Sequence, residues 1–432
     1  MEYIGIAVLI ISFIIFLSIG VPIAYSIGLS ATLTMIINID LIPSFTTLSQ
    51  QIATALDSFA LLAIPFFILA GQLMNRGGIA VRLIDFAKVL VGRLPGGLAL
   101  VNIMANMLFG AISGSAAASA SAIGGFMHPQ MTREGYDKSF SAAVNITSAT
   151  TGLVIPPSNI LIVYSLASGG VSIAALFIAG YIPGILTGLA LMGVAAVFAY
   201  RKNYPRANKL TIKESIFRFL DAIPSLLLLV IVIGGIIAGI FTATEASAVA
   251  VLYTLILSMI YKEIKWKDLP DILIKTVGIT AMVMLLVGTS MGLSWVMSFE
   301  NIPQEVSSAL ISISDNPYII LFIINLILLF VGIFMDMTPA VLIFTPIFLP
   351  IATTQLGLDP IHFGIIMIMN LSVGLCTPPV GSVLFIGCSV AQIGIEKVIK
   401  PLIPFFAAMI IILLLITYVP ALSLWLPHIF GF

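Results

Sequence analysis

Charged side chains are scarce in this 432-residue chain. Asp, Glu, Lys and Arg together make up 8% of it, whereas 60% of the residues are apolar. A soluble domain carries about 25% charged residues, so most of this chain is not built to face water. The 18 basic residues are balanced by 18 acidic ones, which leaves no net charge to attract a nucleic acid. The composition predicts an integral membrane protein in a lipid bilayer, with no nucleic-acid partner.

Cysteine and histidine are also rare, and their scarcity excludes several kinds of site. Cys376 and Cys388 lie in one apolar run, so neither a disulfide framework nor a four-cysteine zinc site is expected. His128, His362 and His428 are far apart in the sequence, and we expect no shared metal site. Without a catalytic pair or a metal cluster, the sequence predicts that the protein is not an enzyme.

The basic residues fall into five clusters, and the stretches between them are long enough to cross a bilayer. The clusters are Arg76 to Arg93, Arg133 with Lys138, Arg201 to Arg218, Lys262 to Lys275, and Lys397 with Lys400. The positive-inside rule places all five on the cytoplasmic side, which forces an even number of crossings between consecutive clusters. With three spans in the first 75 residues, this predicts ten spans and places both termini outside.

Two apolar segments are interrupted near their middle and are predicted to be re-entrant hairpins. Residues 96–131 lie between two basic clusters and are interrupted at Ser113-Gly114-Ser115, so this first hairpin enters from the cytoplasmic side. Residues 318–358 are interrupted at Met335-Asp336-Met337 and have no basic residue at either end. The second hairpin is therefore expected to enter from the opposite side.

A constant offset of 222 residues relates the two halves of the sequence. Gly152-Leu-Val-Ile-Pro-Pro157 falls on Gly374-Leu-Cys-Thr-Pro-Pro379, and Gly110 falls on Gly332. Repeats of opposite topology that each contain a broken helix are typical of secondary transporters. The sequence thus predicts an all-α polytopic fold made of an inverted repeat, with two opposed re-entrant hairpins and two broken helices.

The boundary between the two repeats is predicted at 218/219. Residues 1–218 would hold three spans, the first hairpin, a broken helix at 139–170, a span at 172–200 and a cytoplasmic loop at 201–218. Residues 219–432 would hold the second hairpin, a broken helix at 361–391 and a last span at 401–426, after spans near 219–241, 245–261 and 276–298.

The paired prolines predict a break in the middle of each of the two equivalent helices. Consecutive prolines remove two amide donors and push the preceding residue out of helical angles. Carbonyls freed in this way do not stay unsatisfied in lipid, so such a break persists where it lines a cavity or binds something. A passive proline kink is the alternative interpretation.

Oxygen atoms at the two hairpin tips are candidate ligands for a small cation. The first tip has the hydroxyls of Ser113 and Ser115, and the second has Asp336 and Thr338. Asp336 is the only carboxylate that this topology places deep in the membrane, where an ionisable residue is a functional candidate. Tight helix packing by small residues after Ser115 and capping of a helix by Asp336 are the alternatives.

Polar residues around the two breaks are the candidates for a solute pocket. They are Asn145, Thr147, Ser148, Thr150, Thr151, Ser158 and Asn159 in the first half, and Asn370, Ser372 and Ser382 in the second. No Lys or Arg is expected in the membrane interior. An anionic solute would therefore rely on helix N-termini, hydroxyls and bound cations.

Seven motifs, in order along the chain, resemble the large membrane subunit of tripartite ATP-independent periplasmic (TRAP) transporters of the dicarboxylate and sialic acid type. They are FILAGQLMNRGG at 67–78, GAISGSAAA at 110–118, GYDK at 135–138, the Pro-Pro break at 156–157, FTATEA at 241–246, FMDMTPA at 334–340 and TPPVG at 377–381. Two small departures from the family pattern are Gln72, where Glu is frequent, and Met337, where Thr is frequent; neither is among the proposed site residues.

The resemblance implies Na+-coupled uptake of an organic acid, such as a C4-dicarboxylate or sialic acid, by an elevator motion in the bacterial inner membrane. It also implies two partners, a small membrane subunit and a periplasmic substrate-binding protein. In such a membrane, the two termini that the charge pattern places outside are periplasmic. A stand-alone Na+/divalent-anion symporter of the same architecture is the alternative. The Na+ ligands implied are Ser113, Ser115, Gly152, Ile155 and Pro156 at one site, and Gly332, Met335, Asp336, Thr338, Gly374, Thr377 and Pro378 at the other.

Overall fold

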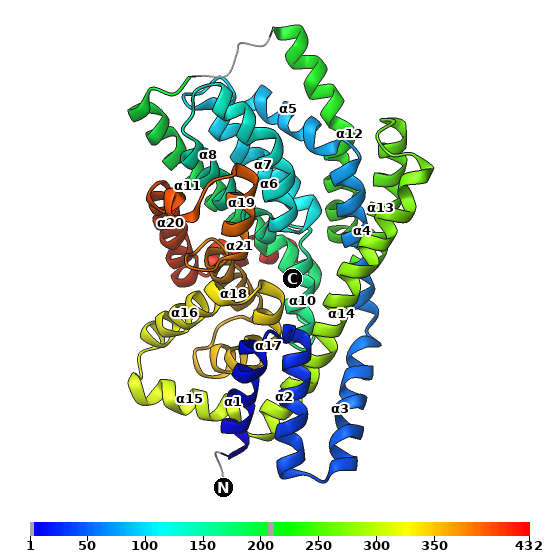
Figure 1. Ribbon diagram of the computed structural model, residues 1–432, viewed down its shortest axis with the longest axis vertical. Coiled ribbons are helices and arrows are strands. Elements are labelled where there is room, and N and C mark those ends of the chain that lie inside the picture. Colours follow the sequence, from blue (N-terminus) through cyan, green and yellow to red (C-terminus); the bar gives the residue numbers. More distant parts are fainter. Residues whose placement is uncertain (1–3, 206–210) are drawn as a thin grey trace.

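The computed structural model describes residues 4–205 and 211–432, and these residues form helices joined by short connections (Figure 1). The predicted all-helical fold class is confirmed. The first half contains α1 (Ile4–Ser18), α2 (Ile23–Asn38), α3 (Leu41–Leu56), η1 (Phe59–Leu62), α4 (Ala63–Arg76), α5 (Ile79–Val91), α6 (Gly97–Ser113), α7 (Ala116–Arg133), α8 (Lys138–Ala149), α9 (Thr151–Val154), α10 (Asn159–Ala167) and α11 (Ile173–Lys202). The second half contains α12 (Ile212–Ile237), α13 (Ala243–Ile260), η2 (Trp266–Asp268), α14 (Leu269–Phe299), α15 (Ile302–Ile313), α16 (Pro317–Phe334), α17 (Met337–Pro350), η3 (Ile351–Gln355), α18 (Pro360–Gly374), α19 (Ser382–Ala391), α20 (Ile395–Tyr418) and α21 (Ala421–Ile429).

The helices of the two halves correspond at the offset found in the sequence. From α5 paired with α15 to α11 paired with α20, the long helices of the second half begin within two residues of the 222-residue offset. Contacts between the halves are reciprocal. The offset relates α2 to α13 and α4 to α14, and α2 packs on α14 as α13 packs on α4. Such reciprocal contacts are what a twofold relation between two copies of one unit produces.

The helices separate into two groups joined by α5 and α15 (Figure 1). We call α1–α4 with α12–α14 the framework group, and α6–α11 with α16–α21 the inner group. In the view of Figure 1, α5 lies near the upper end of the molecule and α15 near the lower end. Each of these two connecting helices follows the last framework helix of its half and precedes the first arm of a hairpin.

Four predicted boundaries differ from the structure. The first 75 residues form four helices in place of three spans, because Asp57 and Ser58 interrupt the segment that matches the continuous α14. The loop predicted at 201–218 is shorter, because α11 continues to Lys202 and α12 already begins at Ile212. Reciprocal hydrogen bonds between Thr211 and Glu214 cap the start of α12. Residues 206–210 of this loop lie outside the described part. The repeat boundary at 218/219 therefore falls inside α12, and the last span is divided before Pro420.

Length and hydropathy identify eight helices in the described residues that could cross a membrane, or nine if the bent pair 138–154 and 159–167 counts as one. The predicted count was ten. It included segments such as α1 and α2, which have 15 and 16 residues, whereas a bilayer core needs about 20 residues, with a range of roughly 17–25. The chain is thus a multi-pass membrane protein.

Ion pairs bring several of the basic clusters together at one end of the molecule. Arg218 Nη1 lies 3.0 Å from Asp85 Oδ1, and Arg82 Nε lies 3.2 Å from Asp221 Oδ2. Arg82 also stacks over the Tyr261 ring, with its guanidinium carbon 3.4 Å from the ring centroid. These contacts attach α5 to α12 and α13.

Paired glycines hold each hairpin against its broken helix. A Cβ on Gly152 would lie 2.2 Å from the Cα of Gly110, and a Cβ on Gly374 would lie 2.6 Å from the Cα of Gly332. In both pairs the obstacle is backbone, which does not move aside as a flexible side chain does. Close backbone approach through small residues is typical of helix packing in membranes.

We expect Gly152→Ala to destabilise the purified protein by about 1–3 kcal/mol, the usual cost of overpacking a close contact. Thermal unfolding in detergent measures this change as a lower midpoint temperature. Gly193→Ala is the matched control, because no atom lies within 4 Å of a Cβ at this helical position. Equal midpoints for the two variants would contradict the packing role of Gly152.

Candidate functional site

The tip of the first hairpin is a short non-helical segment between α6 and α7. Gly114 ends α6 in the left-handed region (φ 62°), and its amide donates to the Gly110 carbonyl at 2.8 Å. Ser115 is extended and caps α7, with its hydroxyl accepting from the Ala118 amide at 3.2 Å. Ser113 is 4% exposed, and its buried hydroxyl has no hydrogen-bond partner within the described residues.

The start of α10 lies directly against this tip. A Cβ on Gly114 would lie 3.1 Å from the amide nitrogen of Asn159, so the tip and α10 are in contact. The side-chain oxygen of Asn159 is buried and, like the Ser113 hydroxyl, lacks a partner in the part of the chain described. Two oxygen atoms without partners thus occur at one place.

The tip of the second hairpin has a carboxylate where the first has hydroxyls. Met335 is extended and ends α16, and Asp336 stands at the N-cap position of α17 without a capping hydrogen bond from its side chain. The Ser382 hydroxyl, at the start of α19, donates to Asp336 Oδ1 at 3.4 Å. The carboxylate therefore faces the second break.

The two proline pairs break α9–α10 and α18–α19, as the sequence predicted. The axes of 138–154 and 159–167 differ by 50°. Pro156 and Pro378 remove the amides that would bond to the carbonyls of Gly152 and Gly374 in continuous helices.

The freed carbonyls are satisfied differently at the two breaks. In the first, the Ser158 hydroxyl donates to Leu153 O at 2.6 Å. In the second, backbone amides bond to the freed carbonyls: Thr377 N donates to Gly374 O at 2.9 Å, and Val383 N donates to Leu375 O at 3.2 Å. A further amide, that of Gly381, donates to Ile333 O at 3.1 Å and ties the second break to the second hairpin.

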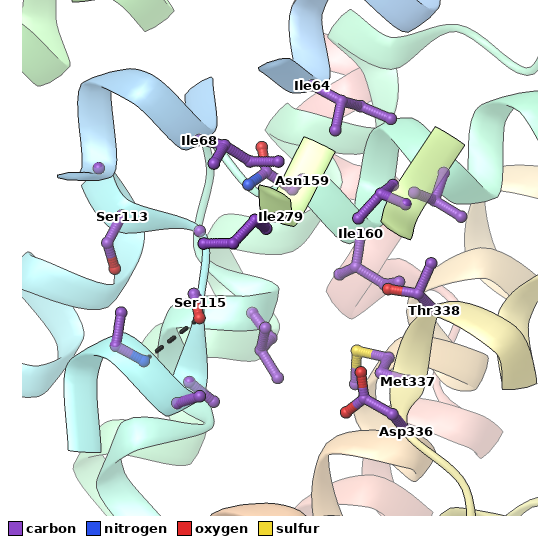
Figure 2. Close-up of a pocket in the computed structure, with 18 of the residues that line it drawn as sticks. Ile64, Ile68, Ser113, Ser115, Asn159, Ile160, Ile279, Asp336, Met337 and Thr338 are labelled. Carbon is purple, nitrogen blue, oxygen red and sulfur yellow. Dashed lines mark hydrogen bonds between the residues drawn. The ribbon is translucent and has the colours of Figure 1, made fainter. Parts of the chain in front are cut away.

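A cavity of about 250 Å³ lies between the two tips (Figure 2). Figure 2 shows Ser113 and Ser115 on one side of it and Asp336, Met337 and Thr338 on the other. The inner group contributes the tips and the breaks; among its lining residues are Ser113, Ser115, Ala117, Leu153, Asn159, Asp336, Thr338, Leu375 and Ser382. The framework group contributes Ile64, Ile68, Gly71, Gln72, Ile279 and Val283.

Four helices begin at this cavity. The first residues of α7, α10, α17 and α19 all line it. The N-terminus of a helix carries partial positive charge and free amide donors, and it is a common binding site for anions. No Lys or Arg is among the lining residues, and Asp336 is the one charged side chain among them. The cavity therefore combines four amide-rich positive ends with one carboxylate.

Eight of the ten predicted solute residues lie away from this cavity. Two of them, Asn145 and Ser148, belong to a buried network that joins the first hairpin to α8. The Asn106 amide donates to Ser148 Oγ at 2.8 Å and to Asn145 Oδ1 at 3.2 Å. The Ser119 hydroxyl donates to Asn106 Oδ1 at 2.7 Å, and the Asn145 amide to the Ala120 carbonyl at 2.8 Å. Asn106, which the sequence analysis missed, is the centre of this network.

The remaining polar candidates also bond within the fold. Thr147, Thr150, Thr151 and Ser372 each donate to a carbonyl three or four residues earlier in the chain. The amide of Asn370 donates to Asn325 Oδ1 at 2.6 Å, a contact between α18 and α16 that matches the Asn106–Ser148 contact of the other repeat. Of the ten predicted solute residues, Asn159 and Ser382 line the cavity.

Two residues that were set aside in the sequence are part of the site. Gln72 and Met337 both line the cavity, so the departures from the family pattern do touch it, contrary to expectation. Gln72 lies in an apolar helix and Met337 follows Asp336, and neither position indicates in the sequence that the side chain lines a cavity. Ile64, Ile68, Ile279 and Val283 were missed as well, because an aliphatic residue in a membrane helix carries no functional signal.

The chain resembles known transport proteins over nearly its whole length. A family model described as "Tripartite ATP-independent periplasmic transporter, DctM component" matches residues 10–422. The protein YgiK of Salmonella typhimurium is 57% identical over 100% of this chain and 99% of its own length. The C4-dicarboxylate TRAP transporter large permease protein DctM of Pseudomonas aeruginosa is 39% identical over 94% of both chains. The isethionate TRAP transporter permease protein DctMQ of Oleidesulfovibrio alaskensis is 40% identical over 96% of this chain and 65% of its own length.

The fold is similar to those of two solved membrane transport proteins. The YdaH transporter of Alcanivorax borkumensis gives a TM-score of 0.66 at 12% identity, with 89% of this chain and 88% of that chain covered. MtrF of Neisseria gonorrhoeae gives a TM-score of 0.64 at 12% identity, with 88% and 86% covered. At this identity the likeness concerns the fold alone.

A cysteine introduced at Ala117 should react with a small hydrophilic thiol reagent, because this residue is exposed and lines the cavity. The background is expected to be low, since Cys376 and Cys388 are 0% and 5% exposed. Ala120→Cys in the same helix is the control, as Ala120 is fully buried. Mass spectrometry after labelling measures the difference, and equal labelling at 117 and 120 would contradict an open cavity.

Proposed function

Because the chain belongs to the DctM component family of tripartite ATP-independent periplasmic transporters, we propose that it is the large permease of a Na+-driven symporter that takes a carboxylate-bearing organic acid into the cytoplasm. The solute would bind in the cavity between the two hairpin tips. The observation that carries this proposal is the meeting of four helix N-termini there with no basic side chain. Main-chain amides at helix ends bind an anion without a buried positive charge.

Relatives with known names support an anionic solute. One is named for C4-dicarboxylate and another for isethionate, a sulfonate. Both solutes present negatively charged oxygens. Sialic acid, which the resemblance in the sequence also suggested, is a carboxylate too. We propose that amides at the starts of α7, α10, α17 and α19 receive these oxygens.

Na+ is proposed as the coupling ion at both tip-and-break junctions. At the first, the buried Ser113 hydroxyl without a partner and the Gly152 carbonyl that loses its amide to Pro156 are the oxygens available, next to Ser115 and Ile155. At the second, the proposed oxygens are those of Asp336, Thr338 and Thr377 with the carbonyls of Gly332 and Gly374, beside Met335 and Pro378. The Ser382–Asp336 hydrogen bond holds this tip against the second break. Bound cations would also offset the charge of the carboxylate solute, which couples the binding of ion and solute.

The division of the cavity lining supports transport by an elevator motion. The hydroxyls, the carboxylate and the helix ends belong to the inner group, whereas the framework group contributes aliphatic side chains, a glycine and Gln72. A solute held by the inner group would move with it. Sliding past an aliphatic surface breaks few hydrogen bonds, so the framework group can act as the fixed part.

Two partners are proposed, a small membrane subunit and a periplasmic substrate-binding protein. The relative named DctMQ is longer than this chain, which covers 65% of it. We propose that its remaining part corresponds to the small subunit. The inner membrane of a bacterium, with the basic end of the molecule in the cytoplasm and both termini in the periplasm, is the proposed location.

Uptake by proteoliposomes tests the coupling. The chain, reconstituted with the small subunit and the binding protein, is expected to accumulate a labelled dicarboxylate or sialic acid under an inward Na+ gradient. Uptake that persists when K+ replaces Na+ would refute Na+ coupling. Uptake by the chain without its partners would favour the stand-alone symporter, which has the same architecture.

Removing one proposed ligand should lower the apparent affinity for Na+ more than it lowers the amount of folded protein. For Ser113→Ala and Asp336→Ala we expect the Na+ concentration for half-maximal uptake to rise roughly tenfold, equivalent to about 1.4 kcal/mol of lost binding. The control is Ser312→Ala, an exposed serine of α15 whose hydroxyl donates to its own helix. An unchanged Na+ dependence with normal expression would remove these residues from the proposed sites.

A further inference from the structure

A second hollow lies on the outer surface of the inner group, between α11 and α20. It has a volume of about 560 Å³ and shares no lining residue with the central cavity. Its walls are Gly193, Val194, Val197 and Phe198 of α11 and Pro404 of α20, and Arg201 and Lys202 stand at one end. We call it the α11–α20 groove. It combines an apolar trough with a cationic end.

The length of the groove corresponds to one leaflet of a bilayer. From Gly193 to Lys202 it follows α11 for nine residue steps, about 14 Å at 1.5 Å per residue. This is close to half of the hydrocarbon thickness of about 30 Å. A partner helix that crosses the membrane would need a contact face about twice as long.

The basic end of the groove lies at the level of the lipid headgroups. α11 has 30 residues and is about 45 Å long, so it extends beyond the hydrocarbon core. Arg201 and Lys202 are in its last turn, before Asn203 ends the helix in the left-handed region. Val197 and Tyr200, in the last two turns of the helix, are 53% and 80% exposed. Apolar surface thus lies below the charges, on the side facing lipid.

The cations of the groove are free to bind a ligand. Arg201 and Lys202 are exposed and form no ion pair in the described residues. Lys400 precedes the groove residue Pro404 by one helical turn, so it projects from the same face of α20. Two acidic residues belong to the neighbouring elements. Glu396 lies against Gly394 at the start of α20, and the Asp137 carboxylate accepts from the Phe140 amide at the start of α8.

An aromatic cluster fixes the shape of the groove. Phe198 of α11 stacks on Phe405 of α20 with ring centroids 6.1 Å apart, and both contact Phe140 of α8, at 5.3 and 5.9 Å. Tyr204 continues the cluster, 5.3 Å from Phe140. At the other end, no atom lies within 4 Å of a Cβ placed on Gly193, so the trough is open there.

We propose that the α11–α20 groove binds an anionic phospholipid of the leaflet at the basic end of the molecule. One acyl chain lies along the apolar wall, and the phosphate is held by Arg201, Lys202 and Lys400. Basic pockets between membrane helices at the cytoplasmic surface suit such headgroups, and Arg binds phosphate oxygens in pairs. A neutral lipid would fill the trough without using these charges.

The test measures lipid retained by the purified chain. We expect native mass spectrometry to detect bound cardiolipin in preference to phosphatidylethanolamine. In Arg201→Gln/Lys202→Gln we expect the retained cardiolipin to fall roughly tenfold or more. Gly193→Leu adds a side chain at the open end of the trough, where a Cβ meets no atom within 4 Å, and should lower retention while leaving every charge in place. It keeps the proposal testable if the charge variant does not fold.

Two matched variants separate this site from general lipid contact. Lys262→Gln/Lys267→Gln removes the same charge from another exposed basic cluster, and Gly234→Leu adds the same side chain at another open helical position. Both should retain cardiolipin. Basic residues in a last turn also stabilise the helix end, so the charge variant can lose stability for that reason alone. Thermal unfolding midpoints are therefore measured with and without added cardiolipin. We expect cardiolipin to raise the midpoint of the controls and to leave that of the groove variants unchanged.

Three results would overturn the proposal. Equal loss of cardiolipin in the groove variants and the controls would show general lipid contact only. Equal retention of phosphatidylethanolamine would remove the role of the cations. A helix of a co-purified membrane subunit that crosslinks to a photoreactive residue at Val197 would show that protein, and not lipid, occupies the groove.

Discussion

The constraint on which this structure depends is that backbone polar groups inside a membrane must be satisfied. Each proline pair removes two amides in mid-helix, and each hairpin tip opens a further break. The fold places tip and break of one repeat against each other, through Gly110 with Gly152 and Gly332 with Gly374. Helix starts and helix ends are thereby concentrated in one region, the region proposed to bind ions and solute.

This concentration explains why the cavity needs so few charged side chains. Helix starts offer amides to an anion, and helix ends offer carbonyls to a cation, so the proposed solute and ions would both have main-chain partners in one small volume. Only Asp336 adds a full charge. A buried Lys or Arg would require desolvation and would hold an anion in every state; partial charges of the main chain avoid that penalty and suit a protein that must also release its solute.

Much of this was predictable because Gly and Pro act locally. The interruptions at Ser113–Ser115 and Met335–Thr338, the Pro-Pro breaks and the 222-residue offset all appear in the helix bounds. The cavity lining was less accessible to sequence reasoning. Asn145 and Ser148 are polar residues in a membrane helix, but their partner is Asn106, and a sequence does not show which polar groups satisfy one another. Ile68 and Val283 line the cavity through tertiary position alone.

The repeat also has a consequence for how such a protein could have arisen. Each half supplies one hairpin tip and one broken helix, and the cavity forms only where the two sets meet. A polypeptide of half this length would build one tip facing empty lipid. It would have to associate with a second copy inserted upside down, so an antiparallel homodimer is the smallest assembly of such halves that could form this cavity. Joining both halves in one chain fixes their opposite orientations and removes the need for that association.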